Sequence, residues 1–397
     1  MPATVLFAKK IIVPSNAANV LQSVNMAAAF AQAGADTFFY PGMRRSAFQT
    51  IPRDSASALA TILAEIGIQP EHARNWRPLP AGNKGVYGLL FRLHIAAAYV
   101  SATTRLAYAR DVMEGYFLSR LKSICKREHK FLFEMHEILH LLHQEQKQYN
   151  WQETFRKEQS VVRAIDGLIV TNGVLAGAAR NIFGYAGPIL VECNGYNPAL
   201  FYPLPLFSDT YPWPGSQDPV ELAYIGSLTP GKGVEELLDA LAILPSRFKL
   251  RIIGSGKQDM TDKVQKKAAS IPQGAERIRL LGHMPQVKLR EACMGVHISV
   301  LPQQQEGYFS PIKLNESLAL GLPLAATPLP IFTAQKALMH MAPDLSPQGL
   351  ATAIQELAAS PDHASRLRAA GIAAAAGYTW QARARRILDF AAGVCAS

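Results

Sequence analysis

The sequence has 397 residues, of which 49% are hydrophobic and 18% charged. These values are those of an ordinary globular protein and predict two domains with sizeable cores. The four cysteines lie far apart without a Cys-x-x-Cys pair, which fits reduced thiols in a cytosol better than a disulfide framework or a zinc knuckle. No run approaches the roughly 20 apolar residues that span a bilayer. Lysines interrupt the first apolar run, so we expect a cytoplasmic protein rather than a secreted one.

The net charge is +10. An excess of basic residues favours an acidic partner, such as a nucleotide, an anionic lipid surface, an acidic polymer or nucleic acid. Charge alone does not choose among these partners.

The first 40 residues predict the start of a parallel, doubly wound sheet. Residues 4–13 read as a strand, residues 20–33 as a helix that Gly34 ends, and residues 36–40 as a second strand. The turn between them lacks a dinucleotide fingerprint, so we expect an acceptor-side loop or a plain connection. Arg44 and Arg45 then form a solvated loop or a contact to an acidic acceptor.

Residues 116–130 predict a basic amphipathic helix after a short strand at residues 106–110. Such a helix either covers the sheet with a solvated basic face or lies on an anionic membrane. The next strand, residues 130–135, carries His136 at its carboxyl end.

The segment from His136 to His140 also matches the zinc protease motif H-E-x-x-H, with His143 one turn further on. On a helix the two outer histidines would bind zinc, Glu137 would be the general base, and Glu153 or Glu158 could be a third ligand. The β-type spacing of the preceding residues argues against that helix.

Residues 150–164 predict a helix, and residues 167–171 and 188–193 predict strands. The second strand leads to the turn Asn194-Gly195-Tyr196-Asn197-Pro198. Residues 203–214 contain four prolines and read as a linker.

A second domain follows the linker. A strand at residues 221–226 leads into the loop Gly226-Ser227-Leu-Thr-Pro-Gly-Lys232-Gly233 and a helix from Val234. Glycine lets a phosphate approach the backbone, and Lys232 adds positive charge. The alternative is a surface loop lysine. Residues 249–256, 277–283 and 297–302 predict further buried strands, and a glycine turn at Gly254 ends the first of them.

Residues 306–328 predict a loop, a short helix (312–320) that Gly321 ends, and a strand. A loop that opens a helix directs free N–H groups at one point, which suits a phosphate. Lys313 adds charge there, and Glu316 could accept hydrogen bonds from sugar hydroxyls. The stretch therefore reads as a nucleotide diphosphate site, or as an ordinary loop–helix–strand unit. The tail predicts three helices, and we expect Arg383, Arg385 and Arg386 to form a solvated face.

Five of these segments, in this order, resemble glycosyltransferase family 4, whose fold is GT-B. They are YARD…FLFEMHEI, the turn at residues 194–198, the loop at residues 226–233, the stretch at residues 306–328, and Tyr378-Thr379-Trp380. The resemblance implies an α/β protein of two doubly wound Rossmann-like domains with a cleft between them. It places an acceptor-side domain at residues 1–202, a nucleotide-sugar domain at 203–379, and a C-terminal helix, 380–397, on the first domain.

The resemblance also implies roles for single residues. His136 would contact the transferred sugar, while Lys232 would clamp the diphosphate beside Ser227, which replaces the family's arginine. Glu306 would be catalytic, although it stands ten residues before Glu316 and the family spacing is eight. The full donor-binding set is Gly226, Ser227, Lys232, Gly254, His283, Met284, Ser310, Pro311, Ile312, Lys313, Leu314 and Glu316.

The function so implied is retaining transfer of a sugar from a nucleotide diphosphate sugar, with UDP-sugar favoured, to a hydroxyl acceptor in cell-surface glycan or glycolipid synthesis. The partners are the donor and a glycan or lipid-linked acceptor, with peripheral contact of residues 116–130 to the inner face of the membrane and no nucleic acid. No Asp-x-Asp motif occurs, so no metal and no cofactor is expected. Two alternatives stay open: an inactive nucleotide-sugar-binding protein and a zinc protease.

Overall fold

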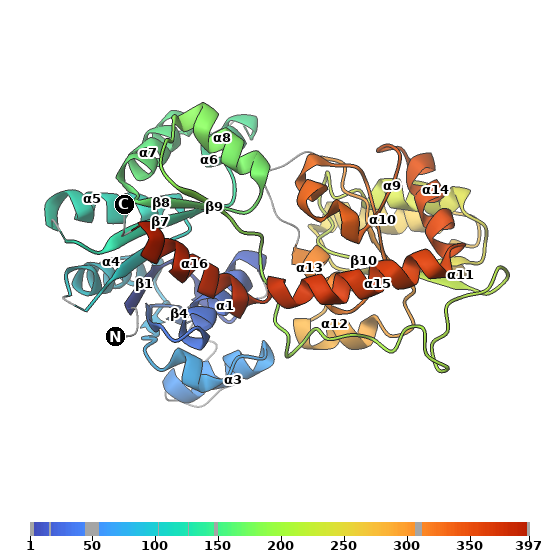
Figure 1. Cartoon of the computed structure of the whole chain (residues 1–397), viewed down its shortest axis with the longest axis horizontal. Helices are drawn as coiled ribbons and strands as arrows, with labels where there is room; N and C mark the ends of the chain where they lie inside the picture. Colours follow the sequence, from blue (N-terminus) through green and yellow to red (C-terminus); the bar gives the residue numbers. More distant parts are fainter. Residues whose placement is uncertain are drawn as a thin grey trace. The chain divides into compact units, whose positions relative to one another are not determined.

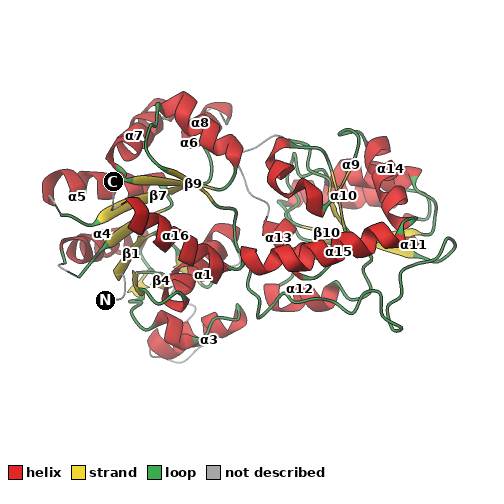
Figure 2. Cartoon of the chain, viewed as in Figure 1, coloured by secondary structure: helices red, strands yellow, loops and turns green. Residues whose placement is uncertain are grey.

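The protein is described by a computed structural model that covers residues 4–15, 17–43, 55–101, 103–125, 127–146, 150–305 and 312–394. The chain forms two compact units, which divide at Asn197/Pro198 and at Tyr378/Thr379. The C-terminal segment belongs to the first unit. Figure 1 shows the elements of each unit and Figure 2 their class.

The first unit is built on a six-stranded parallel sheet with the strand order β3-β1-β6-β7-β8-β9. Apart from the half-buried Lys130, its interior strands are buried along their whole length, as expected for a sheet covered on both faces. The strands are β1 (Thr4–Ala8), β3 (Asp36–Phe39), β6 (Leu106–Ala109), β7 (Lys130–Met135), β8 (Gly167–Val170) and β9 (Ile189–Val191).

Residues 4–13 do not form the single strand that the sequence predicted. β1 ends at Ala8, and β2 (Ile12–Val13) joins β4 (Gly42–Met43) and β5 (Leu79–Pro80) in a separate small sheet. Lys9 and Lys10 separate the two strands, and the Lys9 ammonium donates to Asp111 at 2.6 Å. The lysines therefore mark a change of sheet.

Helices surround the first sheet (Figure 1). The predicted helix at residues 116–130 is instead α5, which ends at Cys125, because β7 already begins at Lys130. The helices are α1 (Ala18–Gln32), α3 (Ser55–Glu65), α4 (Lys84–Val100), α5 (Val112–Cys125), α6 (Leu139–Glu145), α7 (Trp151–Ala164), α8 (Gly173–Phe183) and the short 3₁₀ helix η1 (Pro70–Ala73).

The last helix, α16 (Trp380–Val394), packs on the first unit beside α1 (Figure 1). Trp380, Ala384, Ile387 and Ala391 recur every three or four residues and enter the same core as β1 and α1.

The second unit contains another six-stranded parallel sheet, with the order β12-β11-β10-β13-β14-β15. This is the strand order of a Rossmann fold. The strands are β10 (Val220–Ile225), β11 (Phe248–Ile253), β12 (Ile278–Gly282), β13 (Ile298–Leu301), β14 (Leu324–Ala326) and β15 (His340–Met341). The prediction of two doubly wound α/β units is confirmed.

β12 is not the buried strand that the sequence predicted. It lies at the edge of the sheet, where only one neighbour pairs with it, and its last four residues are exposed. The helices of this unit are α9 (Val234–Ile243), α10 (Gln258–Ser270), α11 (Gly274–Arg277), α12 (Gln286–Ala292), α13 (Ile312–Ala319), α14 (Pro347–Ala358) and α15 (Pro361–Ala375), with 3₁₀ helices η2 (Pro330–Leu338) and η3 (Ala376–Tyr378). Among the described helices, none is both long and apolar enough to cross a bilayer.

Candidate functional site

Strand order shows where each sheet can hold a ligand. In open parallel sheets, ligands bind outside the carboxyl ends of the strands, at the point where the strand order reverses. That point lies between β1 and β6 in the first unit and between β10 and β13 in the second. The second of these places carries the predicted Gly226–Gly233 loop, while His136 in the first unit follows β7, one strand beyond β6.

His136 follows β7 directly, at the carboxyl edge of the first sheet. Its imidazole Nε2 lies 2.7 Å from a guanidinium nitrogen of Arg110 and also contacts the carboxylate of Glu134. Arg110 comes from the end of β6, so two neighbouring strands hold the ring. Among the described residues, both of these polar contacts of the ring involve Nε2 rather than Nδ1.

A buried network of charges supports this histidine. The carboxylate of Glu134 is 1% exposed, accepts a hydrogen bond from Arg383 Nη1 at 2.9 Å, and contacts the Tyr108 hydroxyl. Burial acts to raise the pKa of Glu134, but the positive charge of Arg383 and the contact with His136 lower it to about 2. Glu134 is therefore ionised at neutral pH.

The same surroundings keep His136 uncharged. Burial and the positive charge of Arg110 lower the pKa of His136 to about 4, although Glu134 acts in the opposite direction. Burial and the charge of Arg383 lower the pKa of Arg110 to about 9. A neutral imidazole fixed at a strand end can exchange hydrogen bonds with a polar ligand without placing a full positive charge beside it.

The prediction that Arg383, Arg385 and Arg386 form a solvated face of α16 is wrong for Arg383 and Arg386. Arg383 is 1% exposed and also donates to the Cys193 carbonyl at 2.8 Å, while Arg386 forms a bidentate pair with Glu192. Arg383 lies three residues after Trp380 on the apolar face of the helix, and that position is the signal in the sequence that could have identified it. Arg385 is exposed, as predicted.

The zinc protease motif does not take the conformation that zinc requires. α6 begins at Leu139, so His136 and Glu137 precede the helix instead of sharing a face with His140. His140 Nδ1 lies 2.6 Å from Glu158, and Glu153 pairs with Lys157. His143 Nδ1 lies 3.0 Å from the Thr154 hydroxyl. In the described residues, no three His, Cys, Asp or Glu side chains form a group that could hold a metal.

In the second unit, the loop from Gly226 to Gly233 follows β10 at the switch point. Gly231 and Gly233 have φ values of +78° and +77°, which L side chains rarely adopt. A Cβ on Gly233 would lie 1.6 Å from the Pro302 carbonyl oxygen. Gln304 N donates to the Gly231 carbonyl at 3.0 Å. The loop therefore packs against the segment that follows β13.

Lys232 lies in this loop, two residues before α9. Its side chain is half-buried, and burial lowers the pKa of its ammonium to about 8. A cation that burial disfavours gains most from an anion that replaces the lost hydration. Ser227 is exposed, and its hydroxyl lies 3.5 Å from that of Thr229.

Three successive loops meet through main-chain contacts. Gly226 N donates to Ile253 O at 3.0 Å, and Gly254 N donates to Gly282 O at 2.8 Å. A Cβ on Gly254 would lie 1.7 Å from the Gly226 carbonyl oxygen, so only glycine permits this approach. His283, exposed, and Met284, half-buried, follow Gly282 directly. The structure thus brings Gly226, Gly254 and the His283 turn to one edge of the sheet.

Lys313 and Glu316 lie on α13 and are paired with each other. Lys313 Nζ donates to Glu316 Oε2 at 2.6 Å, and Gln286 Nε2 donates to Glu316 Oε1 at 3.0 Å. Glu316 is 1% exposed. Gln286, which the sequence analysis missed, begins α12 two residues after Met284, so it connects the His283 turn to Glu316. No local pattern marks a glutamine for this position.

The remaining predicted residues differ in burial, and some lie outside the described part of the chain. Ile312 is half-buried at the start of α13, while the Leu314 side chain is 3% exposed and belongs to the core. Glu306, Ser310 and Pro311 lie outside the described residues, as do Arg44 and Arg45.

Comparisons with known proteins agree with this geometry. Residues 219–360 match the family model of Glycosyl transferases group 1. A search of curated proteins gives no match. Among solved structures, a sucrose-phosphate synthase from Thermosynechococcus elongatus is 19% identical, with all of both chains covered and a TM-score of 0.70.

Two further structures resemble the chain at similar coverage. HepE from Anabaena, in complex with UDP, is 15% identical over 99% of this chain and 100% of its own, with a TM-score of 0.69. A protein from E. coli described as trehalose-6-phosphate, bound with UDP-2-fluoro glucose, is 10% identical over 98% and 99%, with a TM-score of 0.63. This chain therefore carries a group 1 glycosyl transferase domain within the GT-B fold, which confirms the predicted enzyme class, glycosyltransferase.

Proposed function

We propose that the protein transfers a sugar from a nucleotide diphosphate sugar to a hydroxyl acceptor with retention of anomeric configuration, as a member of family 4. The observation that carries this proposal is the Gly226–Gly233 loop with Lys232 at the switch point of the second sheet. UDP-sugar is the favoured donor, which the UDP and UDP-2-fluoro glucose in two structural neighbours support.

The chemistry needs stabilisation of a leaving group. As the bond between the anomeric carbon and the diphosphate breaks, negative charge grows on the diphosphate. Lys232 and the main-chain N–H groups of its loop would stabilise that charge. Glu316 would accept hydrogen bonds from ribose hydroxyls, and Lys313, now paired with it, would add positive charge.

His136 would contact the transferred sugar, with Nδ1 as the contacting atom. Its neutral state suits a hydrogen bond to a sugar hydroxyl near a carbon that gains positive charge during transfer. In this proposal Glu306 stays a catalytic residue, and His283 and Met284 would contact the base.

We also propose a cellular setting: the protein is cytoplasmic and contributes to the synthesis of cell-surface glycans or glycolipids. The reaction needs no metal, and the protein contacts the inner face of the membrane peripherally. Within residues 116–130, Lys122 already binds Asp166 and the Ala164 carbonyl, each at 2.8–2.9 Å. Part of that basic surface therefore serves the fold.

A second candidate is a protein that binds a nucleotide sugar without transferring it. Ser227 favours this candidate, because it replaces the arginine that the family uses beside the diphosphate. Only an assay of transfer separates the two.

The test starts with a thermal-shift panel of UDP-, GDP- and ADP-sugars. A ligand at 100 times its dissociation constant stabilises the folded state by about 2.7 kcal/mol. The sugar that stabilises most is then used in labelled form to measure transfer or hydrolysis. We expect Lys232→Ala to lower turnover at least tenfold and Lys266→Ala, an exposed lysine on α10, to leave it unchanged. Equal activity in both variants would remove Lys232 from the mechanism, and donor binding without turnover would favour the second candidate.

A further inference from the structure

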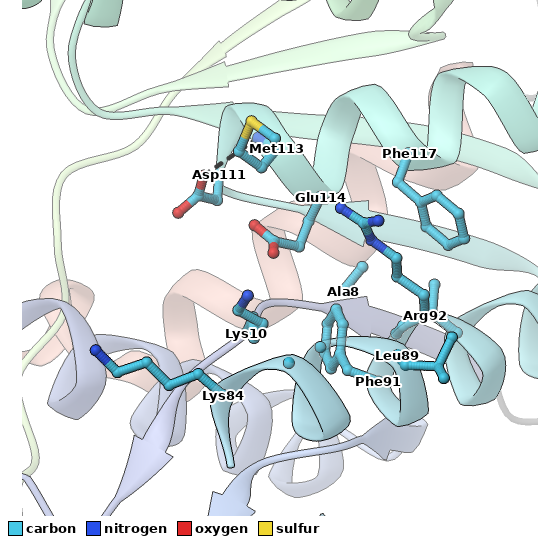
Figure 3. A pocket seen from close by; sticks show the side chains of 13 residues that line it. Ala8, Lys10, Lys84, Leu89, Phe91, Arg92, Asp111, Met113, Glu114 and Phe117 are labelled. Carbon is cyan, nitrogen blue, oxygen red and sulfur yellow. Dashed lines mark hydrogen bonds between the residues drawn. The ribbon is translucent and has the colours of Figure 1, made fainter. Parts of the chain in front are cut away.

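A pocket of about 520 Å³ occupies the switch point of the first sheet (Figure 3). Ala8 at the end of β1 and Asp111 just after β6 lie on its strand side, and α4 and α5 form its walls. This is the place where an open parallel sheet presents a ligand site. None of the roles assigned so far uses this pocket.

The pocket shares Asp111 with the strand end that supports the histidine. Asp111 follows Arg110, whose guanidinium lies 2.7 Å from His136 Nε2. Asp111 accepts from the buried Lys9 ammonium at 2.6 Å and from Met113 N at 3.2 Å, so its carboxylate is fixed at the pocket edge. A ligand in the pocket would therefore lie at the same carboxyl edge of the sheet as His136, although His136 itself does not line the pocket.

The charges in the pocket suit an anionic, hydroxylated ligand. Lys10, Lys84 and Arg92 are exposed at its border, and in the described part of the chain neither lysine forms an ion pair. The Arg92 guanidinium lies 5.9 Å from the centre of the Phe117 ring. Figure 3 shows Lys10 and Glu114 directed toward each other across the cavity. Asp111 is paired with Lys9, and the lining of the pocket carries three further cations and one further carboxyl group, that of Glu114.

Glu114 would complement the cations. Burial and the neighbouring charge of Asp111 raise the pKa of Glu114 to about 7, so its carboxyl group can both accept hydrogen bonds from hydroxyls and donate one. The pocket thus offers cations for a phosphate and a carboxyl group for a polyol or sugar.

The outer wall of the pocket continues into an exposed apolar stripe. Val86, Leu89, Leu93 and Val100 lie on one face of α4, and each is between 38% and 61% exposed. Leu89 also lines the pocket, and Arg92 borders the stripe on the same helix. Large apolar side chains beside basic ones are typical of a helix that lies in the interface of an anionic bilayer.

We propose that the pocket binds the phosphate-bearing, hydroxylated headgroup of an anionic membrane lipid as the acceptor, with the α4 stripe in the bilayer interface. The proposal rests on the proposed transferase function and assigns its acceptor class. It places the membrane contact on α4 rather than on residues 116–130. In transfer, a headgroup hydroxyl oxygen would bond to the anomeric carbon as the bond from that carbon to the diphosphate breaks, and the hydroxyl proton would leave with the nucleoside diphosphate.

The first test is sedimentation of the full chain with vesicles. We expect at least tenfold tighter binding to vesicles of phosphatidylglycerol and phosphatidylcholine (1:3) than to phosphatidylcholine alone. The double variant Leu89→Asp/Leu93→Asp should lose at least tenfold of that affinity, while Ile243→Asp, which changes an exposed apolar residue of α9 in the second unit, should not. Circular dichroism checks that each variant is folded. Equal binding to both vesicle types, or full binding by the α4 variant, would overturn the proposal.

The second test separates a lipid from a soluble anion. Lys10→Ala/Lys84→Ala should weaken binding to the phosphatidylglycerol vesicles at least fivefold. If glucose 6-phosphate stabilises the protein against heat through these lysines and vesicles do not bind, the acceptor is a soluble phosphosugar and the lipid proposal is wrong. Vesicle binding needs no donor, so a failure of donor binding would refute the transferase function and leave this measurement intact.

Discussion

The two sheet edges position their candidate residues by different means. In the first unit, buried charged side chains do so: Glu134 and Arg383, each 1% exposed, hold His136 together with Arg110. In the second unit, the main chain does so: glycines let three loops approach one another within hydrogen-bond distance, and Lys232 lies in one of them.

This difference indicates which property a substitution at each edge should change. Removing one partner of a buried ion pair lowers the stability of the folded protein, because the other charge stays buried without its partner. A glycine loop loses its shape when a side chain is added, while the core below it is unchanged. Changes to the buried ion pair at the first edge should therefore affect stability, and changes to the glycines at the second should affect ligand binding.

The largest effect on transfer should come from His136→Ala. We expect turnover to fall at least a hundredfold, because the variant lacks the neutral imidazole that we propose contacts the transferred sugar. His72→Ala, on η1, is the control and should keep wild-type turnover. Circular dichroism and thermal unfolding should show that both variants are folded. A fully active His136→Ala enzyme would remove the histidine from the site.

Arg383→Met should lower the free energy of unfolding by about 3–5 kcal/mol, because it leaves the Glu134 carboxylate buried without its guanidinium partner. Arg385→Met, on the exposed side of the same helix, should change it by less than about 0.5 kcal/mol. Urea denaturation measures both values. If the two substitutions cost the same, the buried network does not hold the first edge together.

Gly233→Ala should weaken donor binding at least tenfold, with little change in the secondary structure. A left-handed residue with a side chain costs about 1–2 kcal/mol, and the added Cβ would also displace the loop from Pro302. Gly377→Ala, at a site in the same unit where a Cβ meets nothing within 4 Å, is the control. Titration calorimetry with the donor selected by the thermal-shift panel compares them, and equal affinities would show that the loop shape is irrelevant.

The smallest effect should be a pH dependence of donor affinity. Burial lowers the pKa of Lys232 to about 8. Since the diphosphate favours the charged ammonium, affinity should be constant below pH 7, fall about twofold by pH 8, and approach about a tenfold loss by pH 9. Lys232→Arg keeps its charge and should show a flat profile, and any ionisation of the ligand is common to both proteins. Parallel profiles for the two proteins would mean that Lys232 is not the titrating group.

Much of the fold could be predicted from sequence, because its signals are local. Alternating strands and helices predicted two parallel sheets, and strand ends predicted the places of His136 and Lys232. The edge position of β12 was missed because strand order is set by long-range pairing. The helix α4 was missed because apolar residues occur on all of its faces, including the exposed one, so that it lacks a clear period.

The partners within the site were harder to predict than the residues themselves. Arg383 pairs with Glu134 across 249 residues, and no local pattern records that contact. An arginine within a helix is usually solvated, and only its place on the apolar face of α16 indicated otherwise. Gln286 likewise takes its place from the fold, which brings α12 and α13 together at Glu316.

The most direct test of the account is the affinity of UDP-glucose for the wild-type chain and for Lys232→Ala, measured by titration calorimetry with Lys266→Ala as the control. We expect saturable binding at one site, weakened at least tenfold in Lys232→Ala and unchanged in Lys266→Ala. Equal affinity in all three proteins, or no binding of any UDP-, GDP- or ADP-sugar to the wild type, would contradict the assignment of a diphosphate site to the Gly226–Gly233 loop.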